Sequence, residues 1–121
     1  MSIAFASTDL MDQLEAADDP TLDALPFGVI AMSLDGVVTS YNQAESQLSG
    51  LTRESVIGRH FFSSVAPCTN NYLVAHRFES GPMLDAVIDY VFTLFMKPTA
   101  VRLRLLKDPG ARRMYLAVET R

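Results

Sequence analysis

The chain contains a single cysteine, Cys68, which follows the dipeptide Ala66-Pro67. A cysteine thiolate attacks an activated acyl group readily and leaves a stable thioester. The preceding proline restricts the local backbone and lacks an N–H donor, which would help to fix the geometry of a group attached to the sulfur. A lone cysteine is more often a small buried apolar side chain, so the residue by itself leaves both interpretations open.

Two histidines, His60 and His76, lie eight residues on either side of Cys68. A nucleophilic enzyme would pair the cysteine with a histidine base, but no Cys/His signature of a known enzyme family surrounds these residues. The spacing also matches no metal site. We therefore expect no enzyme activity and no metal ion, and we expect both histidines to lie on the surface.

Tyr41 and Glu45 form a second pair with chemical potential, because four residues separate them. Glu45 also follows Asn42 by three residues, which is the spacing of a helix capping box. The spacing alone favours a capping role for Glu45 over a role in a binding site. Ser49, four residues further on, is by type either a surface serine or a hydrogen-bonding partner within a site.

Apolar periodicity and turn residues predict the elements that would position these side chains. Asp18-Asp19-Pro20 is interpreted as the stop of the first helix, and Asp35-Gly36 as a hairpin turn. Helices or helical turns are expected at residues 8–17, 21–25, 42–48, 52–57, 60–65 and 72–79, and strands at 27–34, 37–41, 86–96, 101–106 and 114–120.

This order predicts an α+β fold, with a five-stranded antiparallel sheet, short helices on one side and an N-terminal helical cap. The layout matches the PAS fold. We expect one domain, in which residues 1–25 form the cap and residues 26–121 the core.

Charge is distributed unevenly along the chain. Residues 1–52 contain eight acidic residues and no Lys or Arg, while residues 53–121 carry a net charge of +4, consistent with the overall −4. Either each half solvates its own surface, or the acidic segment docks on a basic face that includes Arg102 and Arg104. Overall acidity argues against nucleic acid as a partner.

No stretch approaches the roughly 18 apolar residues of a membrane span, and residues 1–5 do not begin a signal peptide. We expect a cytoplasmic protein.

Several segments together resemble the photoactive yellow protein family. They are Leu25-Pro-Phe-Gly28, Tyr41-Asn-Gln-Ala-Glu45, Val56-Ile-Gly58, Phe61-Phe-Ser-Ser-Val-Ala-Pro-Cys-Thr69, Tyr90-Val-Phe92 and Met96-Lys-Pro-Thr99. The most specific element is the tyrosine, the glutamate four residues later, and the cysteine after Ala-Pro at the matching distance.

The resemblance implies a blue-light photoreceptor that carries p-coumaric acid as a thioester on Cys68. It implies that Glu45 is buried, protonated and hydrogen-bonded to the phenolate oxygen of the chromophore, that Tyr41 is the second donor, and that Ser49 supports the tyrosine. After photoisomerisation Glu45 would donate its proton, and the buried charge would loosen the cap and signal to a downstream protein that the sequence does not identify. The implied pocket wall is Ile30, Phe61, Val65, Ala66, Thr69, Phe92 and Met96.

The alternative is a PAS module that senses an unconjugated ligand or mediates protein contacts.

Three departures from the family pattern also bear on the site. Leu51 stands where the family has an arginine, and Leu94 where it has a tyrosine. The stretch between Cys68 and Tyr90 is about three residues shorter than in the best-known member. The two substitutions put colour and photocycle rate in question, but not attachment.

Overall fold

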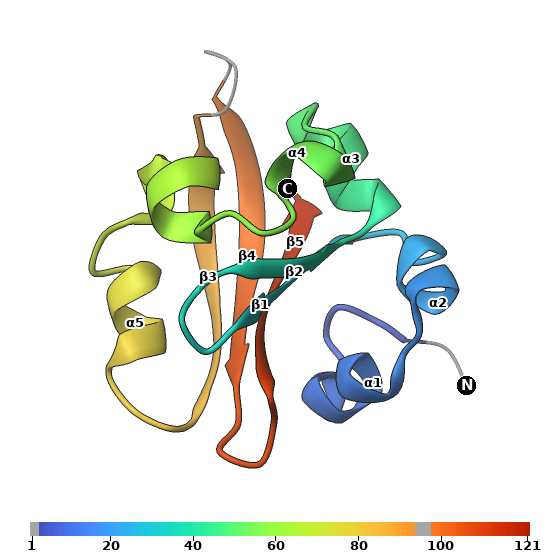
Figure 1. Cartoon of the computed structure of the whole chain (residues 1–121), viewed down its shortest axis with the longest axis vertical. Coiled ribbons are helices and arrows are strands. Elements are labelled where there is room, and N and C mark those ends of the chain that lie inside the picture. The colour runs from blue at the N-terminus through green and yellow to red at the C-terminus, as the bar shows by residue number, and fades with distance from the viewer. Residues whose placement is uncertain (1–2, 94–97) are drawn as a thin grey trace.

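The computed structural model describes residues 3–93 and 98–121, so the predicted positions Leu94 and Met96 lie outside the described residues. Five antiparallel strands form one sheet in the order β2-β1-β5-β4-β3 (Figure 1). The strands are β1 Gly28–Ser33, β2 Val38–Tyr41, β3 Leu84–Phe92, β4 Thr99–Lys107 and β5 Arg113–Thr120. The predicted α+β fold with a five-stranded antiparallel sheet is confirmed.

Alternating side chains divide the central strands between two hydrophobic clusters, one on each face of the sheet. On β1, Ile30 and Met32 belong to the larger cluster, whereas Val29 and Ala31 belong to the smaller one. This follows from the two-residue period of a strand. The larger cluster is covered by the helices that follow β2, and the smaller one by the N-terminal segment.

The helices over the larger cluster are short. They are α3 Gln43–Ser49, α4 Arg53–Val56, the π-helical turn η1 Phe61–Val65, the 3-10 turn η2 Pro67–Thr69 and α5 Ala75–Glu79. Helix α3 ends at Gly50, whose φ of 77° is a left-handed conformation that glycine adopts without strain. This sharp end directs the chain from α3, which contacts β1, toward α4, which contacts β2 (Figure 1).

The N-terminal cap consists of α1 Leu10–Ala16 and α2 Asp19–Asp23. It packs Phe5, Leu10, Leu14 and Leu22 against the smaller cluster. Helix α1 ends before Asp18-Asp19-Pro20, as predicted, but the same residues also start α2, because the Asp18 carboxylate accepts from the Thr21 N–H at 2.9 Å. Helix α2 therefore begins earlier than predicted, with the proline in its first turn, where its missing N–H costs nothing.

Among the other boundaries that differ from the prediction, two have a clear structural cause. Helix α5 begins at Ala75 rather than residue 72, because the Asn71 side chain accepts the N–H groups of Leu73 and Val74 and holds them in a turn. Strand β3 begins at Leu84, two residues before the predicted start, because its pairing with β4 extends to Lys107.

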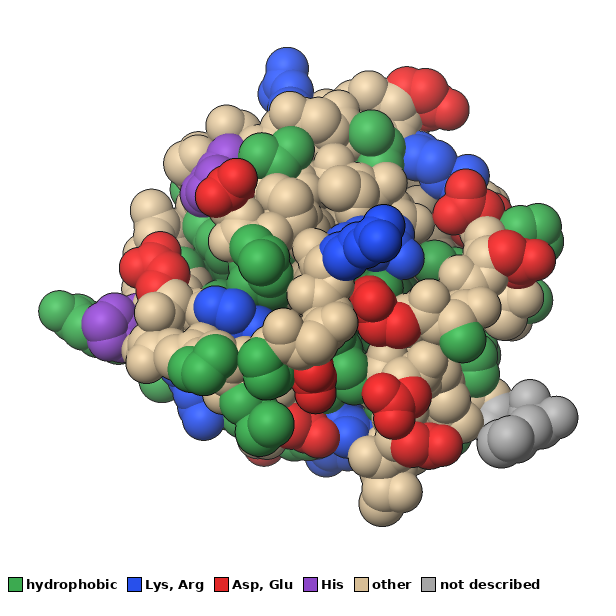
Figure 2. Space-filling model, turned by 60° about the horizontal axis from the view of Figure 1, so that its bottom comes forward, with side chains coloured by type: hydrophobic (Ala, Val, Ile, Leu, Met, Phe, Trp, Pro, Cys, Tyr) green, Lys and Arg blue, Asp and Glu red, His purple; other side chains and the backbone are tan. Residues whose placement is uncertain are grey.

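The two arginines of β4 do not form one basic docking face. Arg102 pairs with Asp89 and Glu119, which are acids of the sheet itself, while the cap binds the guanidinium of Arg104 through backbone carbonyls. Figure 2 shows acidic and basic side chains interspersed over one face of the molecule. Single ion pairs join the acidic half of the chain to the basic half, namely Asp23 with Arg53 and Glu15 with Arg113.

No helix among the described residues is long and apolar enough to cross a membrane.

Candidate functional site

Three of the predicted side chains, Tyr41, Glu45 and Ser49, meet in the protein interior and are here called the site cluster. The Tyr41 hydroxyl lies 2.8 Å from Ser49 Oγ and 3.5 Å from Glu45 Oε2. All three residues are 1% exposed. Tyr41 ends β2, and the other two project from successive turns of α3, so the strand-to-helix connection brings them together.

Glu45 is a buried acid without a cationic partner in the site cluster. Burial raises the pKa of its carboxyl from 4.5 to about 8, against a smaller opposing effect of the hydrogen bond from Tyr41. Burial, and then the charge of Glu45, also raises the pKa of Tyr41. Both shifts favour the neutral form of the two groups, and a carboxyl in its protonated form has a hydrogen to donate.

One carboxyl oxygen of Glu45 lacks a hydrogen-bond partner. Among the residues that the structure describes, nothing bonds to Oε1, although this atom is buried. An unpaired buried polar atom is rare and calls for an explanation. Gly28 makes the space for it, since a Cβ at that position would lie 2.1 Å from Oε1.

Asn42 performs only half of the predicted capping box. Its Oδ1 accepts from the Glu45 N–H at 3.1 Å. The Glu45 carboxyl, however, turns inward to Tyr41 instead of accepting from the backbone N–H of Asn42, as a capping box requires. The same amide binds more widely than its capping role requires, because Oδ1 also accepts from Val29 N and Nδ2 donates to the carbonyls of Leu22 and Phe27. Asn42 thus joins the start of α3 to α2 of the N-terminal cap.

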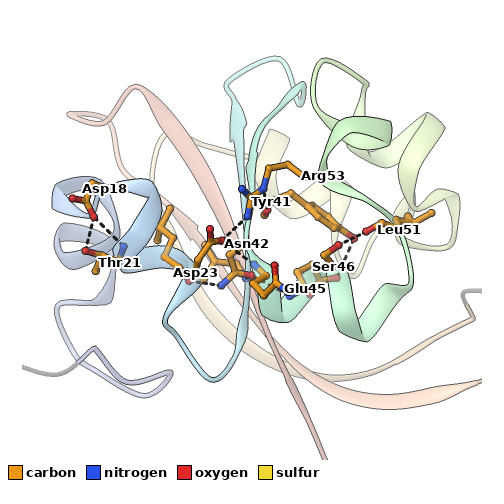
Figure 3. A network of polar contacts seen from close by, with 12 residues as sticks. Asp18, Thr21, Asp23, Tyr41, Asn42, Glu45, Ser46, Leu51 and Arg53 are labelled. Atoms are coloured by element: carbon orange, nitrogen blue, oxygen red, sulfur yellow. Dashed lines mark hydrogen bonds and ion pairs between the residues drawn. The ribbon is translucent and has the colours of Figure 1, made fainter.

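Arg53 provides a second link between the site cluster and the cap (Figure 3). Its Nε donates to the backbone carbonyl of Tyr41 at 2.9 Å, and its Nη2 lies 2.6 Å from Asp23 Oδ1 at the end of α2. Asp23 also accepts from the N–H of Gln43. Residues 41–43 are therefore all tied to α2. Asn42 and Gln43 bond to it directly, and Tyr41 bonds to Arg53, which contacts Asp23 of α2.

Cys68 lies in η2, half-buried, against the same hydrophobic cluster that contains Tyr41. Thr69 closes this turn, since its hydroxyl donates to the carbonyl of Ala66 at 2.7 Å. The other predicted wall residues that the structure describes are buried members of this cluster: Ile30, Phe61, Val65, Ala66 and Phe92. The fold therefore places the thiol and the site cluster on one side of the sheet.

Tyr90 and Asn71, for which no site role was predicted, both donate a hydrogen bond to the backbone carbonyl of Cys68. Tyr90 comes from β3, 22 positions along the chain from Cys68, so no local pattern could reveal the contact. Gly28 and Arg53 were missed in the same way, because each acts across a tertiary contact.

The position where the family has an arginine carries no cation here. Leu51 packs against the larger cluster, and its backbone N–H donates to Ser49 Oγ at 3.1 Å. Of the histidines, His76 is exposed, whereas His60 is half-buried and its Nδ1 accepts from the Ser63 N–H at the start of η1. No group of three or more His, Cys, Asp or Glu residues within the described chain is arranged to hold a metal ion.

Comparisons with known proteins bear on the fold and on the family of the chain. A family model for the PAS fold matches residues 22–81. Over 87% of its length, the chain is 38% identical to the photoactive yellow protein of Halochromatium salexigens, of which the match covers 86%. It is 35% identical to that of Rhodothalassium salexigens over 85% of each chain.

Among solved structures, the chain is similar to the photoactive yellow protein domain of the sensor histidine kinase Ppr from Rhodospirillum centenum. The two share 38% identity with a TM-score of 0.83, over 90% of this chain and 98% of that domain. A PAS domain of an HTR-like protein from Haloarcula marismortui, at 15% identity and a TM-score of 0.68, shares the fold alone. The chain belongs to the photoactive yellow protein family.

Proposed function

We propose that this protein is a blue-light receptor that carries p-coumaric acid as a thioester on Cys68 and signals through its N-terminal cap. The observation that carries the proposal is the site cluster: a buried, protonated carboxyl with an unpaired oxygen, next to a tyrosine hydroxyl, in the core against which the only thiol packs. A cluster of this kind suits a ligand that brings a hydrogen-bond acceptor into an otherwise apolar site.

The residues present fit such a group. When bound, the p-coumaroyl group would supply a photoisomerisable double bond and a phenolic oxygen. Cys68 would hold its acyl end, and Tyr41 and Glu45 would donate hydrogen bonds to its oxygen. Hydrogen bonds to a charged acceptor are worth about 1.5–3 kcal/mol each. The wall side chains Phe61, Val65 and Phe92 would exclude water.

Glu45 is the proton source in this proposal. Burial raises the pKa of its carboxyl, and the carboxyl would pass its proton to the phenolic oxygen once that oxygen had become the stronger base. The carboxylate left behind is buried and has no cation in the site cluster, which costs several kcal/mol. A domain of this size has only about 5–15 kcal/mol of stability, so the new charge is large enough to release a weakly held element.

The cap is the element that such a charge would loosen. Asn42, next to the site, bonds to the carbonyl of Leu22, and Arg53 connects the Tyr41 carbonyl to Asp23. A shift of the β2–α3 connection would strain both links at once. The released cap would then signal to a partner protein.

The test is chemical loading of the unmodified protein with p-coumaric anhydride. The Cys68 sulfur forms a bond to the acyl carbon, the acyl–oxygen bond breaks, p-coumarate leaves, and the thiol proton passes to solvent. We expect a yellow protein whose added mass maps to the peptide that contains Cys68, and a colourless Cys68→Ala variant. If the variant becomes equally yellow, or the native protein binds the dye only reversibly, the covalent photoreceptor is excluded in favour of a non-covalent PAS sensor.

A second test follows the proton. Infrared difference spectra of the loaded native protein should lose a protonated carboxyl band under blue light, and Glu45→Gln should lack this change. A native spectrum without the change would mean that Glu45 is not the donor.

A further inference from the structure

The backbone carbonyl of Cys68 accepts two hydrogen bonds from side chains that the loading chemistry does not itself require. The Tyr90 hydroxyl donates to it from β3, and Asn71 Nδ2 donates to it at 3.1 Å. Asn71 Nδ2 also donates to the Tyr90 hydroxyl at 2.7 Å, so the three groups form a closed ring of hydrogen bonds.

The amide of Asn71 is fully used in this arrangement. While Nδ2 binds Cys68 and Tyr90, Oδ1 accepts the N–H groups of Leu73 and Val74 at 3.0 and 3.1 Å. An amide has two donor hydrogens and one acceptor oxygen with two lone pairs, so every position is filled. This pattern fixes both the orientation of the amide and the turn that carries it.

The ring completes the restraint of the Cys68 backbone. On its N-terminal side, Pro67 sets the local backbone. The peptide plane that follows Cys68 is held at one edge by the Thr69 N–H, which donates to the carbonyl of Ala66, and at the opposite edge by the ring, which binds the Cys68 carbonyl. Since the direction of a Cα–Cβ bond depends on the planes on both sides, the side chain of Cys68 is aimed from both ends.

Tyr90 is well placed to act as the anchor of the ring. It lies in β3, packs against the larger hydrophobic cluster, and stands edge-to-face with Phe92 at 5.9 Å between ring centroids. Its own carbonyl accepts from Arg121. The hydroxyl thus projects from the sheet to a turn that otherwise belongs to the helical layer.

We propose that Tyr90 and Asn71 form a clamp that positions the Cys68 thiol for acylation. The clamp rests on the proposed function, because the reaction that it would assist is the attachment of the p-coumaroyl group to Cys68. The unpaired and buried Oε1 of Glu45 lies on the same side of the sheet, where the proposed function puts the far end of the group that Cys68 would carry. Tyr90 and Asn71 are positioning residues: they bond to the peptide of Cys68 and leave its sulfur free.

Two variants remove the clamp in different ways. Tyr90→Phe deletes the hydroxyl and keeps the aromatic side chain packed against the core. Asn71→Asp keeps acceptors for Leu73 and Val74 but loses the donor, and its carboxylate would draw the Tyr90 hydroxyl away from Cys68. The control is Tyr72→Phe, which deletes the hydroxyl of a nearby tyrosine that is 78% exposed.

The first measurement needs no chromophore. Because the chain has one cysteine, protein grown with carbonyl-¹³C cysteine carries a single labelled carbonyl, at Cys68. Hydrogen bonds weaken a C=O bond, so its infrared band should move to higher frequency in Tyr90→Phe and in Asn71→Asp, and stay in place in Tyr72→Phe. A band that stays in place in both clamp variants overturns the clamp.

The second measurement compares two reactions of the same thiol. Loading with p-coumaric anhydride should slow by about tenfold in both clamp variants, as expected when hydrogen bonds that orient a reacting group are lost. Alkylation by iodoacetamide, which requires no orientation in the pocket, should change by less than about twofold. Native loading rates in the variants overturn the clamp, and so does an equal loss in both reactions, which would mean a general change in the thiol.

The two proposals fail in distinguishable ways. A native protein that takes up no p-coumaroyl group refutes the photoreceptor and the clamp together. Normal loading of the native protein, with variants that load equally fast, refutes the clamp alone.

Discussion

Two buried ionisable side chains, Glu45 in the site cluster and Arg104 under the N-terminal segment, are held in opposite ways. Glu45 is 1% exposed, makes one long contact with Tyr41, and has an oxygen without a partner among the described residues. Arg104 is 5% exposed, and its guanidinium donates to both oxygens of Asp85 and to the carbonyls of Phe5 and Ser7.

The two side chains therefore have different roles. Every contact of Arg104 favours its charged form, so it is a permanent charge that fixes the N-terminal segment on the sheet. The surroundings of Glu45 favour the neutral form, and no cation of the site cluster stabilises the ionised form. Arg104 therefore holds the N-terminal cap in place, whereas Glu45 is able to change its charge and disturb the cap.

Loss of Arg104 should have the largest effect. Arg104→Ala leaves the buried Phe5 carbonyl without its donor, which costs about 1–3 kcal/mol, while the half-exposed Asp85 is solvated by water. We expect a loss of this size in urea unfolding, with faster hydrogen exchange in residues 3–16. The matched control is Arg102→Ala on the same strand, whose pairs are exposed and worth at most about 1 kcal/mol. Equal effects of the two variants would contradict the fixed role of Arg104.

The charge state of Glu45 should appear in the pH dependence of stability. The pKa of the carboxyl is about 8 in the folded protein against 4.5 ordinarily, so the folded state binds the proton more tightly. Its contribution is complete below about pH 4.5 and is lost as the pH rises through 8. The unloaded protein should thus lose up to a few kcal/mol across this window relative to Glu45→Gln, measured by urea unfolding at each pH.

The difference between the two curves removes the contributions of His60 and His76, which both proteins share. Parallel curves would mean that Glu45 is ionised at neutral pH, and its contrast with Arg104 would disappear.

The space around the Glu45 carboxyl gives a third test. Gly28→Ala would place a Cβ 2.1 Å from Oε1 and 3.1 Å from Glu45 Cβ, so the acid must move. Overpacking of this kind costs about 1–3 kcal/mol. In the loaded protein the absorption maximum should shift, because the donor to the phenolic oxygen is displaced. An unchanged spectrum together with native stability would place the carboxyl elsewhere.

The smallest effect is expected at the link between the two regions. The Arg53–Asp23 pair is partly exposed, and such pairs contribute about 0.2–1 kcal/mol. Arg53→Ala should therefore barely change global unfolding. It should reduce the acceleration of hydrogen exchange in α2 that light produces in the loaded protein. Arg59→Ala, in a neighbouring exposed loop, is the control. An undiminished light response would leave Asn42 as the coupling residue.

Local patterns predicted much of the fold, because they reflect local physics. The two-residue alternation in β4 and the glycine that ends α3 come from backbone geometry, and the structure contains both. Asn42 was correctly identified as a helix cap. The start of α2 was misjudged, because Asp18 and Pro20 are signals for both the end of one helix and the beginning of the next.

By itself, the sequence determined the types and spacing of the reactive groups: one thiol after a proline, and a tyrosine, an acid and a serine at four-residue intervals. Only the tertiary structure decided which way Glu45 turns, because its capping role and its buried role require the same spacing and differ in what covers the helix. It likewise buried Arg104, which the strand pattern placed on an exposed basic face, and brought Tyr90 to Cys68. Contacts between distant segments set both burial and hydrogen-bond partners, and these two together set the charge of a buried side chain.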